Sequence, residues 1–150
     1  MAQYFRLEVL SVATGGFSED ARIARCSDRE GNSNVYRGGL RVGHGDASRY
    51  ADVAVRELSC GHSNSQYAVQ ILAELDALDG VRHANILEIL GYAYQSQPGT
   101  QPRAFLVYPF VPGGTLTGWL CAVEGVDERP NAEWRLRVAL GVASALTALH

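Results

Sequence analysis

The spacing of apolar and polar positions predicts three strands in the first third of the chain. Between residues 21 and 58, three short runs have the composition and alternation of strands, and turns rich in Gly, Asp, Ser and Asn separate them. Strands joined by short polar turns are typical of an antiparallel meander. The predicted strands are "ARIARC", "NVYRGGL" and "ADVAVREL". Residues 1–20, which reach the glycine pair of "TGGF", are interpreted as a lead-in segment.

The period of the pattern then changes to that of a helix. Tyr67, Ile71, Leu75 and Leu78 recur at helical spacing, and Gly80 stands where a helix often ends. Two further runs rich in β-branched and aromatic residues, "NILEILGYAY" and "RAFLVYPF", predict strands four and five. We therefore expect three strands, one helix and two strands.

Two helices are predicted after the fifth strand. Thr115 opens the short run "TLTGWLCAV", and Asn131 is placed as the N-cap of the long run "NAEWRLRVALGVASALTALH". Apolar residues occupy most of the circumference of the long helix, which is typical of a helix that is buried against a partner. We expect this helix to bind another protein.

Composition narrows the class of protein further. The formal charge is −3 and no cluster of Lys or Arg supplies a basic field, which argues against nucleic acid as a partner. No run of 18 apolar residues and no signal-like start is present, so we expect no transmembrane segment and a cytoplasmic location. Three widely spaced cysteines agree with a reducing compartment.

Six blocks of the sequence resemble a known family. In order they are "LSVATGGFSED", "NVYRGGL", "VAVREL", "LAELDALDGVRHANILEILGY", "FLVYPFVPGGTLTGWL" and "EWRLRVALGVASALTALH". They are similar to successive blocks of receptor-like or Pelle/IRAK-like serine/threonine protein kinases. The resemblance implies an α+β fold in which residues 21–111 form a kinase-like N-lobe and hinge. That N-lobe would have a five-stranded antiparallel sheet and one αC-type helix, with the first C-lobe helices in residues 112–150.

One implied site residue departs from the family pattern. In "VAVR", Arg56 stands where the family has the lysine that pairs nucleotide phosphates with a helix glutamate, and Glu74 matches that glutamate. A guanidinium is planar and larger than an ammonium. Arg56 is therefore better suited to bind a carboxylate than to bind the nucleotide phosphates that the family lysine contacts. We expect an Arg56–Glu74 pair. The plainer alternative is two unrelated exposed charges.

The implied phosphate-binding turn departs further. Its three glycines would fall at Asp28, Glu30 and Ser33, none of which is glycine, although Gly31 lies nearby. Acidic side chains at a phosphate site add repulsion of about 4 kcal/mol per close unit pair near a protein surface, before salt screening. The sequence therefore disfavours tight Mg-ATP binding. A solvated acidic turn with no binding role is the alternative.

The implied adenine-binding positions are better preserved. Val35 and Ala54 match residues that cover the base, Tyr108 matches the residue at the back of the slot, and Pro109 and Val111 match hinge residues that bind through the backbone. Weak ATP or adenine binding is the cofactor expectation. The same apolar residues would also be buried in a sheet that binds nothing.

The resemblance also implies what should follow residue 150. Family members continue into a catalytic loop and a metal-binding D-F-G segment, whereas this sequence ends at His150, so no catalytic residue and no metal ligand is predicted. Cys60 and His62 with Cys26 or His44 fit no common zinc motif. The expected function is a truncated, inactive kinase-like binding or decoy module. A piece of an active kinase and a weak nucleotide-sensing module are the alternatives.

Overall fold

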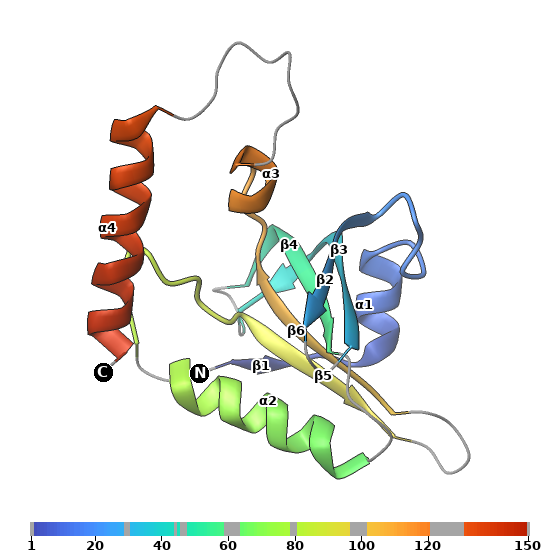
Figure 1. Ribbon diagram of the computed structural model, residues 1–150. Coiled ribbons are helices and arrows are strands. Elements are labelled where there is room, and N and C mark those ends of the chain that lie inside the picture. Colours follow the sequence, from blue (N-terminus) through green and yellow to red (C-terminus); the bar gives the residue numbers. More distant parts are fainter. Residues whose placement is uncertain are drawn as a thin grey trace. The chain divides into compact units, whose positions relative to one another are not determined.

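The computed structural model describes residues 2–28, 31–43, 45, 48–58, 64–78, 81–96, 102–120 and 131–149. The chain divides into two compact units, Met1–Gly80 with Glu88–Phe110 and Val81–Leu87 with Val111–His150. In the order shown in Figure 1, the elements are β1 (Gln3–Tyr4), α1 (Leu7–Ala13), β2 (Arg22–Asp28), β3 (Gly31–Val42), β4 (Arg49–Leu58), α2 (Asn64–Leu78), β5 (Gly91–Gln95), β6 (Arg103–Pro109), α3 (Leu116–Leu120) and α4 (Ala132–Leu149).

The first unit is built on one sheet with the strand order β1-β5-β6-β4-β3-β2. Strands β2, β3 and β4 are successive antiparallel neighbours, so the predicted meander is confirmed. The sheet has six strands where five were predicted. The additional strand is β1, which comes from the lead-in segment and pairs parallel with β5.

The fourth predicted strand is longer than the strand that the structure contains. "NILEILGYAY" was predicted as a strand throughout, but β5 begins only at Gly91. A turn closed by the Ile86 N–H and the His83 carbonyl, 3.0 Å apart, precedes it. Ile89 is buried although it lies outside the strand, which explains why its apolar neighbourhood resembled one. The side chain of Tyr67 and residue Gly80 lie outside what the structure describes.

Alternate residues of the central strands supply two separate cores, one on each face of the sheet. Val53, Val55, Phe105 and Val107 are fully buried with Leu10 on the face that α1 covers. Leu58, Ala104 and Leu106 are buried with Ile71 on the face that α2 covers. Because neighbouring residues in a strand point to opposite faces, this single run of strand sequence positions both helices.

Helix α1 reaches the sheet at a glycine. A Cβ at Gly38 would lie 2.7 Å from the carbonyl oxygen of Ala13, so no larger residue fits there without a shift of the backbone. The chain then turns through Gly15, Gly16 and Phe17, all with positive φ, before β2 begins. This confirms that the glycine pair ends the preceding element.

In the second unit, both predicted helix starts are confirmed. The Oδ1 atom of Asn131 accepts the N–H of Trp134 at 2.8 Å, and the Oγ1 atom of Thr115 accepts the N–H of Gly118 at 3.1 Å. Ser144 of α4 lies 3.0 Å from the Nε2 atom of His83, which holds the helix beside residues 81–87. No residue in the described span of α4 is buried, and five of its large apolar side chains are exposed: Leu136, Leu140, Val142, Leu146 and Leu149.

Candidate functional site

The candidate site lies on the α2 face of the sheet, where β4 and α2 bring two opposite charges together. The Nη1 atom of Arg56 lies 3.5 Å from the Oε1 atom of Glu74. Each side chain keeps about a third of its surface exposed, at 33% for Arg56 and 31% for Glu74. The predicted pairing of these two residues is present. Their predicted role in holding a nucleotide stays a prediction.

Tyr108 joins the same carboxylate from β6. Its hydroxyl donates a short hydrogen bond to the Oε1 atom of Glu74, which is also the atom nearest to Arg56. Burial raises the pKa of Tyr108 well above its ordinary value, the Glu74 carboxylate raises it further, and Arg56 acts in the opposite direction. The phenol therefore stays a neutral donor at physiological pH. One carboxylate oxygen thus serves two partners.

Strand register explains why these residues share a face. Arg56 is directly opposite Val35 of β3, and Ala54 is directly opposite Tyr108 of β6. Residues directly opposite each other in antiparallel strands point to the same face. Val35 and Ala54 are both half-buried there. The predicted adenine-covering pair therefore lies on the same face as the Arg56–Glu74 pair.

The implied hinge begins in the first unit. Pro109 ends β6, and the N–H of the following Phe110 donates to the carbonyl oxygen of Asp52 at 3.0 Å. The guanidinium of Arg37, which is paired with Asp52 at 2.8 Å, lies 4.3 Å from the centre of the Phe110 ring. This end of the strand is therefore fixed by both backbone and side chains. Val111, the other implied hinge residue, belongs to the second unit and is exposed.

The implied phosphate-binding turn lies at the tip of the β2–β3 hairpin. Asp28 is directly opposite Gly31 in the ladder, and Ser33, opposite Cys26, is buried. Ser33 is two residues before Val35 in β3, so the two side chains share one face of the sheet, and the Ser33 side chain is buried there. Glu30 lies outside the described residues.

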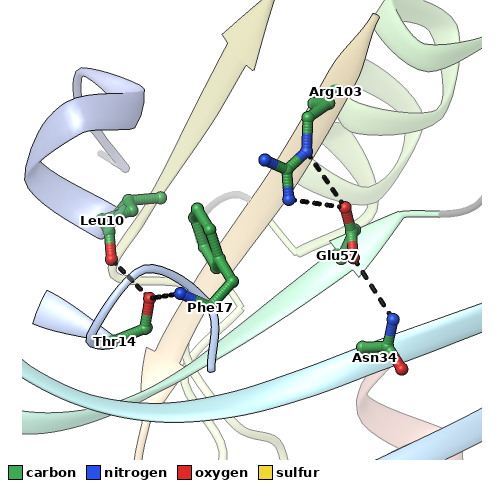
Figure 2. A network of polar contacts seen from close by, with 6 residues as sticks. All are labelled: Leu10, Thr14, Phe17, Asn34, Glu57 and Arg103. Atoms are coloured by element: carbon green, nitrogen blue, oxygen red, sulfur yellow. Dashed lines mark hydrogen bonds and ion pairs between the residues drawn. The ribbon is translucent and has the colours of Figure 1, made fainter. Parts of the chain in front are cut away.

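The opposite face of β4 carries a second Arg–Glu pair that the sequence analysis did not predict. The Nε and Nη2 atoms of Arg103 donate to the Oε1 atom of Glu57 at 3.2 and 2.9 Å, and Asn34 donates to the Oε2 atom at 3.4 Å. The Arg103 guanidinium also lies 4.7 and 4.9 Å from the ring centres of Phe17 and Phe105. Figure 2 shows the hydrogen bonds that join Arg103, Glu57 and Asn34, with the ring of Phe17 nearby.

The buried Thr14 stabilises the turn that places the Phe17 ring beside Arg103. The hydroxyl of Thr14 donates to the carbonyl oxygen of Leu10 at 2.8 Å and accepts the N–H of Phe17 at 3.2 Å (Figure 2). The Phe17 ring stacks on Phe105, with centroids 4.8 Å apart. The only signal in the sequence was the "TGGF" turn itself. Its distant partner strand could not be read from local spacing.

The described part of the chain has neither a metal-binding cluster nor a helix that could span a membrane. No group of three or more His, Cys, Asp or Glu residues there could hold a metal ion. None of the helices there has the length and apolar content that crossing a bilayer requires. His44, Cys60 and His62 lie outside the described residues.

Comparison with known proteins places these features in a family. The family model for the protein tyrosine and serine/threonine kinases matches residues 29–150. A proline-rich receptor-like protein kinase of Arabidopsis thaliana is 34% identical over 97% of this chain and 18% of its own length. A probable receptor-like serine/threonine-protein kinase of the same plant is 30% identical over 99% of this chain and 30% of its own length.

Two further similar proteins carry names that bear on activity. A probable inactive leucine-rich repeat receptor-like protein kinase of Arabidopsis thaliana is 30% identical over 97% of this chain and 17% of its own length. The solved structure of an apo pseudokinase matches with a TM-score of 0.69 and 24% identity, over all of this chain and 49% of that one. The chain thus spans less than a third of the length of these curated relatives.

The sheet, the α2 helix and the Arg56–Glu74 pair across them define an N-lobe of the protein-kinase class, and the predicted α+β fold is confirmed. The chain belongs to the protein tyrosine and serine/threonine kinase family, and the relatives reported above are receptor-like kinases.

Proposed function

We propose that this chain is a kinase-like binding module of the receptor-like kinase type that has little or no phosphoryl-transfer activity. The observation that carries the proposal is the arrangement around Glu74. Its Oε1 atom accepts the hydroxyl of Tyr108 and is the nearest carboxylate atom to Arg56. The position at which the family uses a compact lysine ammonium for phosphate is thus taken by a guanidinium with a carboxylate partner.

The chemistry of the two cations supports inactivity. A lysine ammonium is a compact charge with three donors that can rotate, whereas a guanidinium is planar and larger. Phosphoryl transfer depends on exact placement of positive charge around the phosphates, because electrostatic stabilisation supplies most of the rate enhancement. The absence of the family's glycines from the turn near Gly31 also disfavours phosphate binding, because glycines let backbone amides approach phosphates closely.

The exposed surface of α4 supports a binding role. Leu136, Leu140 and Leu146 are 59%, 61% and 53% exposed in the structure. Burying one such side chain contributes about 1.5–3 kcal/mol, so a partner that covered several of them would gain substantially. We propose that the partner is another signalling protein, such as a kinase, and that the chain acts on it as a binding or decoy module in a cytoplasmic setting.

Nucleotide binding by the 150-residue chain tests the inactivity. We expect no Mg²⁺-dependent thermal shift with ATP in wild type, and a small one after Arg56→Lys because the compact ammonium returns. Arg56→Gln is the matched control and should show none. Micromolar Mg-ATP affinity, or metal-dependent labelling of a protein substrate that Arg56→Gln abolishes, would contradict the proposal. A shift with adenosine that needs no metal would favour a nucleotide-sensing module instead.

Site-specific photo-crosslinking tests the binding role. A benzophenone amino acid replaces Leu140 in one variant and Arg137, which is exposed and paired with Glu133 in α4, in the control. We expect a discrete adduct with one signalling protein, identified by mass spectrometry, from position 140 and much less from position 137. Equal adducts from both positions, or none from either, would count against a role for α4.

A further inference from the structure

A groove of about 600 Å³ lies in the first unit, between α1 and β3. Val9, Val12 and Ala13 line it on the helix side, and Gly39 and Leu40 line it on the strand side. Val9 and Val12 are 45% and 84% exposed, although they stand beside the core that α1 covers. This groove shares no residue with the Arg56–Glu74 pair or with α4.

The strand side of the groove is a sheet edge. Pairing between β2 and β3 ends at Arg22 and Tyr36, whereas β3 continues to Val42. The N–H of Arg37 still donates to the carbonyl oxygen of Ala21 at 2.7 Å. Beyond it, among the residues that the structure describes, β3 pairs only with β4.

Backbone alternation shows which groups face this edge. Successive residues of a strand direct their N–H and C=O groups to opposite sides. Because the Arg37 N–H points away from β4, those of Gly39 and Arg41 do so as well. An exposed edge of this kind is a template for an additional strand. Two donors and two acceptors are therefore presented to the groove.

The side chains around the edge define a pattern for an added strand. Leu40 is buried in the core beneath α1, so its face of β3 is the helix face. Arg41 is directly opposite Tyr50 on the other face, and a Cβ at Gly39 would meet the Tyr50 hydroxyl. Residues of an added strand would thus point in turn towards α1 and towards the Arg41–Tyr50 face.

Two charges at the groove add specificity. Glu8 on α1 and Arg41 on β3 both line it and both are exposed, and neither has an ion-pair partner among the described residues. Glu8 lines the groove from the helix, and Arg41 lines it from the face of β3 that it shares with Tyr50. The two charges therefore reach the groove from its two sides.

We propose that this groove binds an extended peptide segment of a partner protein, which adds to β3 as an antiparallel strand opposite residues 38–42. Peptide addition to a free edge draws affinity from main-chain hydrogen bonds and specificity from alternate side chains. The favoured segment has a basic residue towards Glu8, then an acidic residue towards Arg41. Apolar residues then face Val9 and Val12, and a small polar residue between them faces Gly39.

Two peptides of the same composition test this proposal with the 150-residue chain. The probe is acetyl-Lys-Glu-Val-Thr-Val-amide, and the control is acetyl-Glu-Lys-Val-Thr-Val-amide. Wild type should bind the probe about threefold or more tightly than the control, a difference expected from two exposed ion pairs. In ¹⁵N-resolved NMR titrations the amides of Gly39 and Arg41 should shift and become protected from exchange. The double variant Glu8→Lys, Arg41→Glu should reverse the preference.

Each other outcome overturns the proposal. Saturable binding that leaves the Gly39 and Arg41 amides unchanged would place the peptide elsewhere. Equal affinities for probe and control in both proteins, or no binding at the solubility limit of the peptides, would remove the predicted recognition. Protection of the same amides that rises with protein concentration in the absence of peptide would make a second copy the occupant.

Discussion

Consecutive residues of β4 form two Arg–Glu pairs that differ in contact distance and in the number of donors to the carboxylate. Arg56 faces α2 and approaches one oxygen of Glu74 at 3.5 Å, and that oxygen also accepts Tyr108. Glu57 faces the α1 side, where Arg103 donates to it twice and Asn34 donates to its second oxygen. The first pair is long and shared. The second pair is short, and its carboxylate has a further donor in Asn34.

The surroundings of the two pairs explain the difference. The Arg103 guanidinium lies between Glu57 and the stacked rings of Phe17 and Phe105, next to a core whose strand residues are fully buried. Arg56 lies between a strand and a helix whose described side chains include the buried Ile71 and the partly buried Leu75 and Leu78. We infer that the α1 face holds the sheet rigid, while the α2 face can exchange partners around Glu74. Four predictions can break or sharpen this contrast.

The largest effect is expected at Phe105. The side chain is fully buried and supports both Phe17 and Arg103, so Phe105→Ala should lower the free energy of unfolding by about 3–5 kcal/mol. Urea denaturation followed by circular dichroism measures the change. Val12→Ala, at a position that is 84% exposed, is the control and should stay within about 0.5 kcal/mol of wild type. A loss at Phe105 no larger than that of the control would refute the rigid-face interpretation.

The next effect is the coupling between Glu57 and Arg103. A double-mutant cycle with Glu57→Gln and Arg103→Gln should give a coupling energy of about 1–2 kcal/mol. That range is the value for hydrogen bonds between charged groups reduced for the 40% exposure of Arg103. Equilibrium unfolding of the four proteins supplies the number. A coupling near zero would mean that the aromatic rings alone hold Arg103 in place.

Tyr108→Phe should have a smaller effect with a distinctive pH dependence. The hydroxyl donates to a carboxylate, so its loss should cost about 1 kcal/mol at pH 7. Because burial raises the folded-state pKa of Tyr108 above the unfolded value near 10, its stabilising contribution is complete below pH 10 and is lost as pH rises above that. Wild type should therefore lose stability above pH 10 more steeply than Tyr108→Phe. Parallel stability curves above pH 10 would exclude this linkage.

The sequence predicted one of these faces much better than the other. Apolar alternation in β4 and the β-branched and aromatic content of β6 were enough to predict these strands, and the resemblance paired Arg56 with Glu74 because both residues occupy family positions. The Glu57–Arg103 pair was missed, since its members lie 46 residues apart and no motif links them. Its position became visible only through the register of β4 and β6.

The lead-in segment is a second case in which contacts with a distant part of the chain could not be predicted from the local sequence. The apolar residues within residues 1–20 are too few for their period to distinguish a lead-in segment from a packed helix. In the structure Leu10 of α1 is fully buried, Thr14 is buried as well, and Gly38, 24 positions later in the printed sequence, is the glycine that α1 approaches. Helix α1 is thus defined by contacts with a distant strand, and local propensity carries no information about those contacts.

The smallest effect, and the sharpest test of the contrast, is the coupling between Arg56 and Glu74. A cycle with Arg56→Gln and Glu74→Gln should give less than about 1 kcal/mol, because the pair is part-exposed and its contact is long. The same cycle repeated in the Tyr108→Phe background should give a larger coupling. In that background Tyr108 no longer competes with Arg56 for the Oε1 atom of Glu74. Glu57 and Arg103 should couple equally in both backgrounds. If the Arg56–Glu74 coupling stays constant when Tyr108 loses its hydroxyl, the two donors do not compete and the α2 face is as fixed as the α1 face.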